Sequence, residues 1–467
     1  MCLPQRKLRI WIDAICINQD DLDERDQQVS MMDDVYRQAR EVLVWLGPER
    51  SSTQSAITSL QKILQCRASS IDLNSVNFDE HSDHLLPEDV GWPAICEFFC
   101  TAWFRRLWCV QEFTLARRAV CFRGMHQVVW DDLLFAACWI ADSPERMSGL
   151  DLESRLTVCM LENIRMYPMV EQPLWSLLVS VLQWRWITTD PRDQIYAILG
   201  LANYQNLDMR VRKLLDPDYR LPLARVYANA TRAAIMQEDD LFLLSYCSWR
   251  HPASDQDGCV SDCPSWVPVY HNRGVPTHSA KTGPTKEEST KAVVDHETAW
   301  DTLRIEGSVV DEIGCTRGYI ENFCEAKRTA AILADFWDIM MEELVPRSLI
   351  PELASRLRTM ILVREHSDRQ NVTETRDVKT AQDIADFRSF VEGCWPPRVG
   401  SPPVELGAHD VPVKRDHEKT ARAIWGACWG KELLITRSGR IGMAHPDAQV
   451  GDKICVFWNA ADPFVMR

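Results

Sequence analysis

The hydrophobic and polar positions at the start of the chain alternate between strand-like and helix-like spacing. Leu8–Ile15 alternates β-forming and polar residues with a period of two, which predicts a strand. Residues 23–39 place apolar side chains three and four apart along one stripe, which predicts a helix. A second strand is predicted over Glu41–Leu46, ending at Gly47-Pro48. A strand, a helix and a strand in this order form a βαβ unit, which implies a parallel sheet with a right-handed crossover.

This mixed pattern continues to about residue 145. The predicted elements are helices over residues 51–66, Ala94–Thr101, Leu107–Arg117 and Trp130–Ala141, and a third strand over Ala119–Arg123. Residues 67–90 are polar and acidic, and we expect a long loop there. Residues 1–145 are therefore predicted to form a small α/β domain.

Helical spacing dominates the next region, residues 146–254. Asp190 can cap a short helix, Pro191 suits its first position, Asp193 adds an acid to its first turn, and Gly200 ends it. A longer helix is predicted over Leu223–Gln237.

The remainder of the chain divides into a linker and an α+β region. Residues 255–300 are rich in Pro, Ser, Gly and charge, which predicts a surface loop or linker. The elements predicted for residues 301–467 are a strand over Leu303–Ile313, helices over Ala330–Val345 and Pro351–Arg364, and short β runs over 432–436, 439–443, 452–457 and 463–466. These runs, separated by turns, favour a small antiparallel sheet or partial barrel.

Composition narrows the class of protein. A chain of 467 residues is longer than a single hydrophobic core usually organises. No apolar run in it approaches the length needed to span a bilayer. With 52 basic and 67 acidic residues the net charge is −15, which argues against a nucleic-acid binder. The 17 cysteines lie mostly within apolar periodic segments, and no apolar segment follows the basic residues of the first seven positions. We therefore expect reduced thiols in a cytoplasmic protein that binds no membrane.

The stretch Trp103–Ala116 carries the candidate chemistry. Trp108 and Glu112 are four apart on a predicted helix, so both project from one face. A carboxylate beside a large aromatic ring can act on a sugar or nucleotide, because a low-dielectric setting strengthens its effect on a developing cation. The alternative is a structural glutamate that pairs with Arg105 or Arg106.

Three further residues and one cysteine–histidine set are candidates for a role in binding. Asp13, Asn18 and Gln19 follow the first predicted strand, where open α/β sheets bind ligands, although Asn18 and Asp20 equally suit a turn and a cap. The set comprises Cys247, His251, Cys259 and Cys263. Its spacing is not that of a standard zinc site, so no metal is expected. The chain also lacks the glycine patterns of Rossmann and P-loop proteins.

Several of these stretches together resemble the fungal heterokaryon-incompatibility (HET) domain family. The specific segments are Trp11–Gln19, Glu24-Arg25 with Met32 and Tyr36, Val42–Gly47 and Trp103–Glu112. Looser similarity extends to Asp190–Asp193, Pro264–Pro268 and Gly451–Arg467. The resemblance implies a role in non-self recognition, with growth arrest or cell death when incompatible hyphae fuse. It also implies partners among other HET or non-self-recognition proteins, including homotypic association.

HET domains are similar to Toll/interleukin-receptor (TIR) domains, some of which cleave NAD at the nicotinamide–ribose bond. Trp108-Cys109-Val110-Gln111-Glu112 matches the TIR arrangement Trp-Cys-x-x-Glu around the catalytic glutamate. The resemblance thus implies Glu112 as the catalytic residue, a ligand pocket with Asp13, Asn18, Gln19 and Trp108, NAD as substrate, and no required cofactor. A fixed carboxylate suits this chemistry because the ribose becomes an oxocarbenium-like cation.

The chain departs from the family pattern at its beginning. The family usually starts with a strand and helix around a Ser-Tyr-x-Trp-Gly block, and only seven residues precede Leu8 here. In a flavodoxin-like sheet the missing strand is central, between the strands predicted at Ile10 and Val42. We therefore expect either a TIR/flavodoxin-like parallel sheet truncated at the N-terminus, with reduced NAD cleavage, or an incomplete gene model that lacks the upstream strand. The alternative function is a signalling adaptor, or an inactive copy, in which Glu112 is structural.

Overall fold

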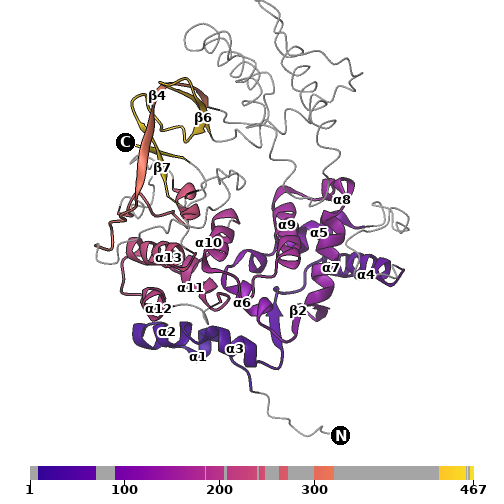
Figure 1. The fold of residues 1–467 in the computed structure, drawn as a ribbon. Coiled ribbons are helices and arrows are strands. Elements are labelled where there is room, and N and C mark those ends of the chain that lie inside the picture. The colour runs from indigo at the N-terminus through magenta and orange to yellow at the C-terminus, as the bar shows by residue number, and fades with distance from the viewer. Residues whose placement is uncertain are drawn as a thin grey trace, which may run out of the picture. The chain divides into compact units, whose positions relative to one another are not determined.

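The computed structural model describes residues 9–69, 90–184, 186–203, 208–238, 241–247, 262–271, 299–319, 431–458, 460 and 463–467 (Figure 1). Contacts divide the chain into two compact units, which we describe separately. The first unit comprises Met1–Glu238, Asp262–Pro264 and Val269–Arg273, and the second comprises the other residues. The first unit therefore contains both the predicted α/β domain and most of the predicted helical region.

The predicted strand over Leu8–Ile15 is wrong. Leu8 lies outside the described residues, Ile12 is extended, and Asp13–Cys16 forms the one-turn helix α1. The predicted βαβ unit is therefore absent from this part of the described chain. The physical reason is that a strand needs a paired neighbour, and no described segment pairs with the backbone of residues 9–12.

The single helix predicted over residues 23–39 is two helices. Helix α2 spans Leu22–Val29, and its cap is Asp21, whose carboxylate accepts hydrogen bonds from two backbone amides of the first turn. Helix α3 spans Met32–Gln38. Between the two helices the Ser30 hydroxyl donates a hydrogen bond to the carbonyl oxygen of Gln27 at 2.7 Å. This local bond competes with the helical backbone pattern, so the helix is interrupted although the apolar spacing continues.

A three-stranded sheet lies in the first unit, with the order β1-β2-β3. Its strands are β1 (Val42–Trp45), β2 (Ala119–Arg123) and β3 (His126–Val129). Strands β1 and β2 pair in parallel, with Val42 opposite Ala119, and both were predicted. Strand β3 pairs antiparallel with β2 through a tight turn in which Gly124 has a φ of +58°. Because β3 has only four residues and half of them are polar, its strand pattern was too weak to predict.

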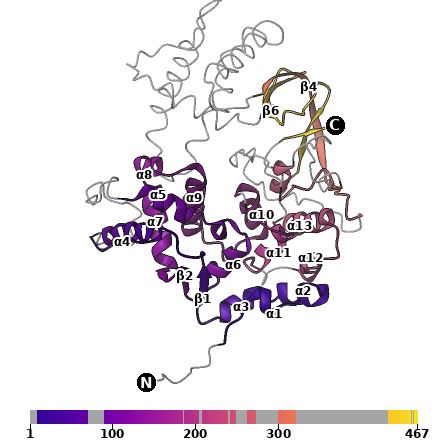
Figure 2. The ribbon, with the colours of Figure 1, turned by 180° about the vertical axis from the view of Figure 1, so that it is seen from behind.

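The crossover from β1 to β2 is long and helical. It contains α4 (Thr53–Ser69), α5 (Trp92–Phe99), the 3-10 turn η2 (Ala102–Arg105) and α6 (Trp108–Thr114). These elements confirm the three helices predicted there. In both ribbon views α4 lies beside α7, which spans Trp130–Ala141 as predicted, and α5 lies beside α9, Leu152–Met166 (Figures 1 and 2).

The core of the first unit is apolar and extends through its helical part. The other helices are α8 (Pro144–Ser148), α10 (Leu174–Gln183), α11 (Asp193–Leu199), α12 (Met209–Leu215) and α13 (Leu223–Glu238). The largest fully buried side chains include Leu60, Ile63, Ile95, Phe99, Phe104, Leu107, Leu133, Ile140, Leu161 and Tyr227. Since each Å² of apolar surface removed from water contributes about 25 cal/mol, these side chains supply much of the folding free energy.

The second unit contains a five-stranded antiparallel sheet, which confirms the small antiparallel sheet expected near the C-terminus. It contains η3 (Phe242–Tyr246) and the strands β4 (Gly307–Tyr319), β5 (Glu432–Thr436), β6 (Ile441–Ala444), β7 (Lys453–Phe457) and β8 (Phe464–Met466), in the order β6-β5-β4-β7-β8. Ile313, Leu434 and Ala448 form its small core cluster. The helices predicted over Ala330–Val345 and Pro351–Arg364 lie outside the described residues.

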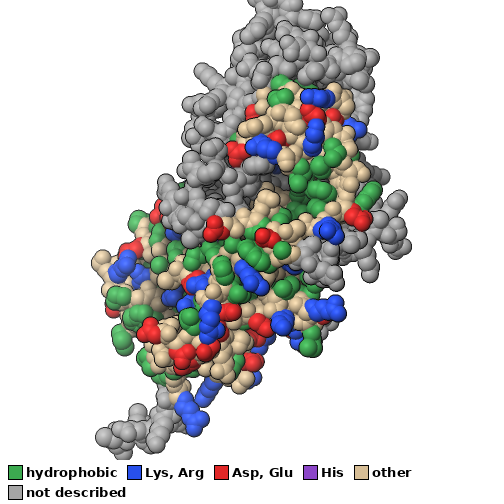
Figure 3. Space-filling model, turned by 90° about the vertical axis from the view of Figure 1, so that its left-hand side faces the viewer, with side chains coloured by type: hydrophobic (Ala, Val, Ile, Leu, Met, Phe, Trp, Pro, Cys, Tyr) green, Lys and Arg blue, Asp and Glu red, His purple; other side chains and the backbone are tan. Residues whose placement is uncertain are grey.

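The described surface mixes basic and acidic side chains. Lys and Arg side chains are interspersed with Asp and Glu on the face in Figure 3. Within the described ranges no helix has the length and apolar character that crossing a membrane requires.

Candidate functional site

The carboxyl group of Glu112 lies at an aromatic cluster between η2, α6 and α7. The indole Nε1 of Trp103 donates a hydrogen bond to Glu112 Oε2 at 3.3 Å. The Trp103 ring makes edge contacts with Phe104 and Trp130, and Phe113 stacks on Trp130 with ring centroids 4.2 Å apart. These contacts fix the indole and so fix the direction of its N–H toward the carboxyl group.

Burial dominates the electrostatics of Glu112. Removal from water raises the pKa of the carboxyl group, while hydrogen bonds from Trp103 and Cys109 and the charge of Arg106 act to lower it, and the charge of Asp13 raises it further. The resulting pKa lies above the ordinary value of 4.5. Glu112 is therefore a carboxyl group that is easier to protonate than a surface glutamate, held by two hydrogen-bond donors.

Tyr36 and Cys109 belong to the same electrostatic site. The pKa of the buried Tyr36 phenol is raised by burial and then by the charges of Glu112 and Asp13. Burial also raises the pKa of the Cys109 thiol, with the charge of Glu112 adding to the effect. Cys109 is thus an un-ionised thiol that donates to Glu112, and it lacks the thiolate character of a nucleophile. We call Asp13, Tyr36, Trp103, Arg106, Cys109 and Glu112 the Glu112 cluster.

The direct ion pair considered for Glu112 is not formed with Arg105. Arg105 instead pairs with Glu153 on α9. Arg106 affects Glu112 through its charge, but among the described residues no salt bridge joins the two side chains. Glu112 is consequently held by hydrogen bonds from an indole and a thiol.

Trp108 has a different partner from the one expected. Its side chain hydrogen-bonds to Asp193 on α11, and this bond acts to lower the pKa of that carboxyl group against a larger effect of burial, which raises it. The indole that bonds Glu112 belongs to Trp103, which precedes α6 in sequence. Helical spacing alone could not identify Trp103, because spacing relates only residues within one helix.

Only one of the other three predicted binding residues acts on Glu112 within the described chain, and it does so through its charge. Asp13, exposed on α1, contributes its charge to the pKa of Glu112. The side chain of Asn18 accepts a hydrogen bond from the backbone N–H of Asp20 at 3.3 Å, which forms a turn before α2. Gln19 is exposed, and no described contact joins Asn18 or Gln19 to Glu112. The geometry at Asn18 matches the alternative role as a turn residue, and the cap is Asp21.

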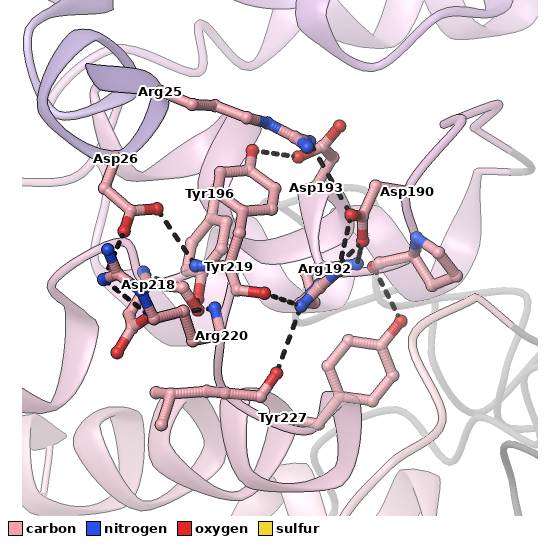
Figure 4. A network of polar contacts seen from close by, with 12 residues as sticks. Arg25, Asp26, Asp190, Arg192, Asp193, Tyr196, Asp218, Tyr219, Arg220 and Tyr227 are labelled. Atoms are coloured by element: carbon pink, nitrogen blue, oxygen red, sulfur yellow. Dashed lines mark hydrogen bonds and ion pairs between the residues drawn. The ribbon is translucent and has the colours of Figure 1, made fainter. Parts of the chain in front are cut away.

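A second polar arrangement joins two of the motifs noted in the sequence (Figure 4). Arg25 on α2 lies 3.6 Å from a carboxylate oxygen of Asp190 and 3.5 Å from the centroid of the Tyr219 ring. Arg192 pairs with Asp190 at 2.9 Å and donates to the backbone oxygens of Tyr219 and Leu221. Burial acts to raise the pKa of Asp190, but its bonds with Arg192 lower it overall.

Asp193 completes this arrangement from the start of α11. Its buried carboxyl group accepts a hydrogen bond from the Tyr219 hydroxyl as well as from Trp108. Because all these side chains satisfy one another, we interpret the arrangement as a structural connection between α2, α11 and the segment before α13. Through Trp108 this connection also reaches α6, the helix that carries Glu112.

The candidate metal ligands are only partly described. Within the described ranges no group of three or more His, Cys, Asp or Glu side chains could hold a metal ion. His251 and Cys259 lie outside those ranges, so the set with Cys247 and Cys263 is not described as a whole.

The fold and the Glu112 cluster define a mixed α/β protein with a partly buried carboxyl group beside a short parallel strand pair. Residues 3–112 match the family described as Heterokaryon incompatibility protein (HET), and the match ends at Glu112. These residues are therefore similar to HET domains, in agreement with the sequence resemblance. No solved structure matches the chain.

A second comparison extends the similarity beyond residues 3–112. The chain is 29% identical over 323 residues to Heterokaryon incompatibility protein 6, OR allele, of Neurospora crassa. The matched region covers 58% of this chain and 46% of the relative, so the chain spans about half the length of that protein. The likeness to TIR domains stays a prediction.

Proposed function

We propose that this protein acts in fungal non-self recognition and that its first unit triggers growth arrest or death by hydrolysing NAD. The observation that carries the enzymatic part is the Glu112 carboxyl group, held by the indole of Trp103 and influenced by the charge of Asp13. The match of residues 3–112 to the HET family and the similarity to a Neurospora incompatibility protein support the biological role.

The chemistry uses the charges of substrate and site together. The nicotinamide ring of NAD is cationic, so its binding favours the ionised forms of Glu112 and Asp13 and opposes the effect of burial on Glu112. The bond between the ribose carbon and the ring nitrogen then breaks, and its electron pair leaves with neutral nicotinamide. The Glu112 carboxylate stabilises the ribose cation, water adds to the ribose carbon, and one proton is released.

The test is expression of wild type and Glu112→Gln in a fungal host, with growth and cellular NAD as readouts. Glutamine keeps the size of the side chain and its ability to accept from Trp103 but cannot ionise. We expect NAD loss to slow by about 10²–10³-fold, the range found when one transition-state group is removed. Glu153→Gln, on α9, is the matched control and should behave as wild type. Equal NAD loss in wild type and Glu112→Gln would refute the enzymatic part.

A second candidate, a non-enzymatic signalling module, rests on a different observation. The edge strand β1 and residues 9–12 expose large apolar side chains, which suits association with other proteins. Under this alternative Glu112 stabilises the fold through Trp103, and Glu112→Gln remains toxic while NAD stays constant.

The proposal also includes location and partners. We place the protein in the cytoplasm, where thiols such as those of the buried Cys109 and Cys121 would stay reduced. Its proposed partners are other non-self-recognition proteins and further copies of itself.

A further inference from the structure

The outer edge of β1 has no partner strand in the described part of the chain. Strand β1 is at the end of the order β1-β2-β3, and its backbone bonds run to β2 from Val42 and Leu46. Because backbone groups alternate in direction along a strand, the amides and carbonyls of Leu43 and Trp45 point to the open edge.

This edge carries none of the usual protection against pairing. Its sequence is Val42-Leu43-Val44-Trp45, without proline or charge, whereas exposed edges usually contain lysine, proline or a bulge. The side chains of Leu43 and Trp45 are 52% and 59% exposed, while those of Val42 and Val44 are buried. The strand is therefore apolar on both faces and open along one edge.

Residues 9–12 of the same unit have the complementary features. Ile12 has an extended backbone, with φ −140° and ψ 121°. The Trp11 ring packs edge-on against Tyr36, while Ile10 and Ile12 are 59% and 43% exposed. This in–out alternation is that of a strand, yet the segment pairs with no described strand, including β1 of its own chain.

We propose that residues 9–12 of one copy add as a strand to the open edge of β1 in a second copy. Ile10 and Ile12 are two residues apart, as are Leu43 and Trp45, so all four side chains meet on one face of the extended sheet. The exchange is reciprocal and closes with two-fold symmetry, which gives a dimer. The inference rests on the proposed association with its own kind and is independent of the chemistry at Glu112.

The experiment measures the mass of the full chain by sedimentation velocity over a range of concentrations. The edge variant carries Leu43→Lys and Trp45→Lys, and the segment variant carries Ile10→Lys and Ile12→Lys. The control variant, Met125→Lys with Met209→Lys, changes side chains that are 88% and 82% exposed elsewhere. Circular dichroism and melting temperature verify that each variant is folded.

We expect wild type and control to dimerise, and each lysine variant to raise the dissociation constant about thirtyfold or more, the effect of losing central apolar contacts. Mixing the edge and segment variants should restore dimers, because each mixed pair retains one intact exchange.

A folded wild type that is monomeric throughout would overturn the proposal. So would dimers that survive in the segment variant, since these would form through edge-to-edge pairing of β1 or through another surface. Glu112→Gln should dimerise as wild type does, which separates this result from the test of NAD hydrolysis.

Discussion

The indole Nε1 of Trp103 donates a 3.3 Å hydrogen bond to the Oε2 atom of Glu112, from a 3-10 turn that lies outside the helix carrying the glutamate. This bond favours the ionised carboxylate in surroundings where burial favours the neutral form. The bond therefore orients Glu112 and offsets part of the effect of burial on its ionisation.

Trp103→Phe tests how much this hydrogen bond contributes to the free energy of unfolding. Phenylalanine retains an aromatic ring but cannot donate to Glu112, so the pKa of the carboxyl group should rise further. We expect the free energy of unfolding at pH 7 to fall by about 1–3 kcal/mol, and by less at pH 4, where the carboxyl group is protonated. Urea denaturation at both pH values measures the difference. Trp458→Phe, at an exposed tryptophan outside the proposed dimer contact, is the control, and an equal loss at both pH values would contradict the expected role.

Glu112→Gln should change how stability depends on pH. Since the folded pKa of Glu112 is raised, its contribution to stability is fully present below the ordinary value of 4.5 and is lost as the pH rises through the folded value. Glutamine does not titrate, so the variant should gain stability relative to wild type as the pH increases. Denaturation midpoints from pH 4 to pH 8 give this comparison.

Glu97→Gln is a control in which the expected change of stability with pH has the opposite sign to that of Glu112→Gln. The pKa of Glu97 is lowered by hydrogen bonds from Ser52 and Arg50, so its contribution is present above 4.5 and is lost as the pH falls through the folded value. This variant should lose stability relative to wild type at neutral pH. If the stability of both variants relative to wild type changed with pH in the same direction, the raised pKa of Glu112 would be contradicted.

Tyr219→Phe tests the connection between α2 and α11. The substitution removes the hydroxyl that donates to the buried Asp193 but keeps the ring beneath Arg25. We expect a loss of about 1–3 kcal/mol in the free energy of unfolding, because a buried carboxyl group loses a donor. Tyr167→Phe, at an exposed tyrosine, should change stability by no more than about 0.5 kcal/mol. Equal effects of the two substitutions would mean that the hydroxyl of Tyr219 adds nothing.

Gly200→Ala tests how closely α3 approaches the end of α11. A Cβ atom at Gly200 would lie 2.5 Å from Cβ of Asp33 and 3.1 Å from Oε1 of Gln111. We expect a loss of about 1–3 kcal/mol, as for other overpacked sites, measured by thermal or urea denaturation. An unchanged melting temperature would show that α3 moves away freely.

Gly200 also illustrates what a sequence pattern can and cannot explain. The prediction that it ends α11 is confirmed, since it is the C-cap residue of that helix. Its φ is −64°, however, so glycine is not needed there for a left-handed conformation. The close approach of Asp33 is what requires a residue without a side chain, and that approach depends on tertiary packing.

The first predicted strand shows the opposite case, in which the local pattern was sound but the element did not form. Residues 9–12 alternate as a strand should, and Trp11 and the exposed isoleucines respect that alternation. A strand also requires a neighbour, and the segment has none among the described residues. Alternation could not supply this information, because pairing is a relation between distant parts of the chain.

The sequence by itself determined the elements whose apolar spacing is local and strong, such as β1, α7 and the antiparallel strands near the C-terminus. It also determined the resemblance to HET domains, because the segments that carry it are contiguous. Only the tertiary structure decided which indole bonds Glu112, that Trp108 bonds Asp193, and that Arg25 reaches Asp190. These contacts join residues on different elements, whose meeting is set by the packing of the whole unit rather than by spacing within one segment.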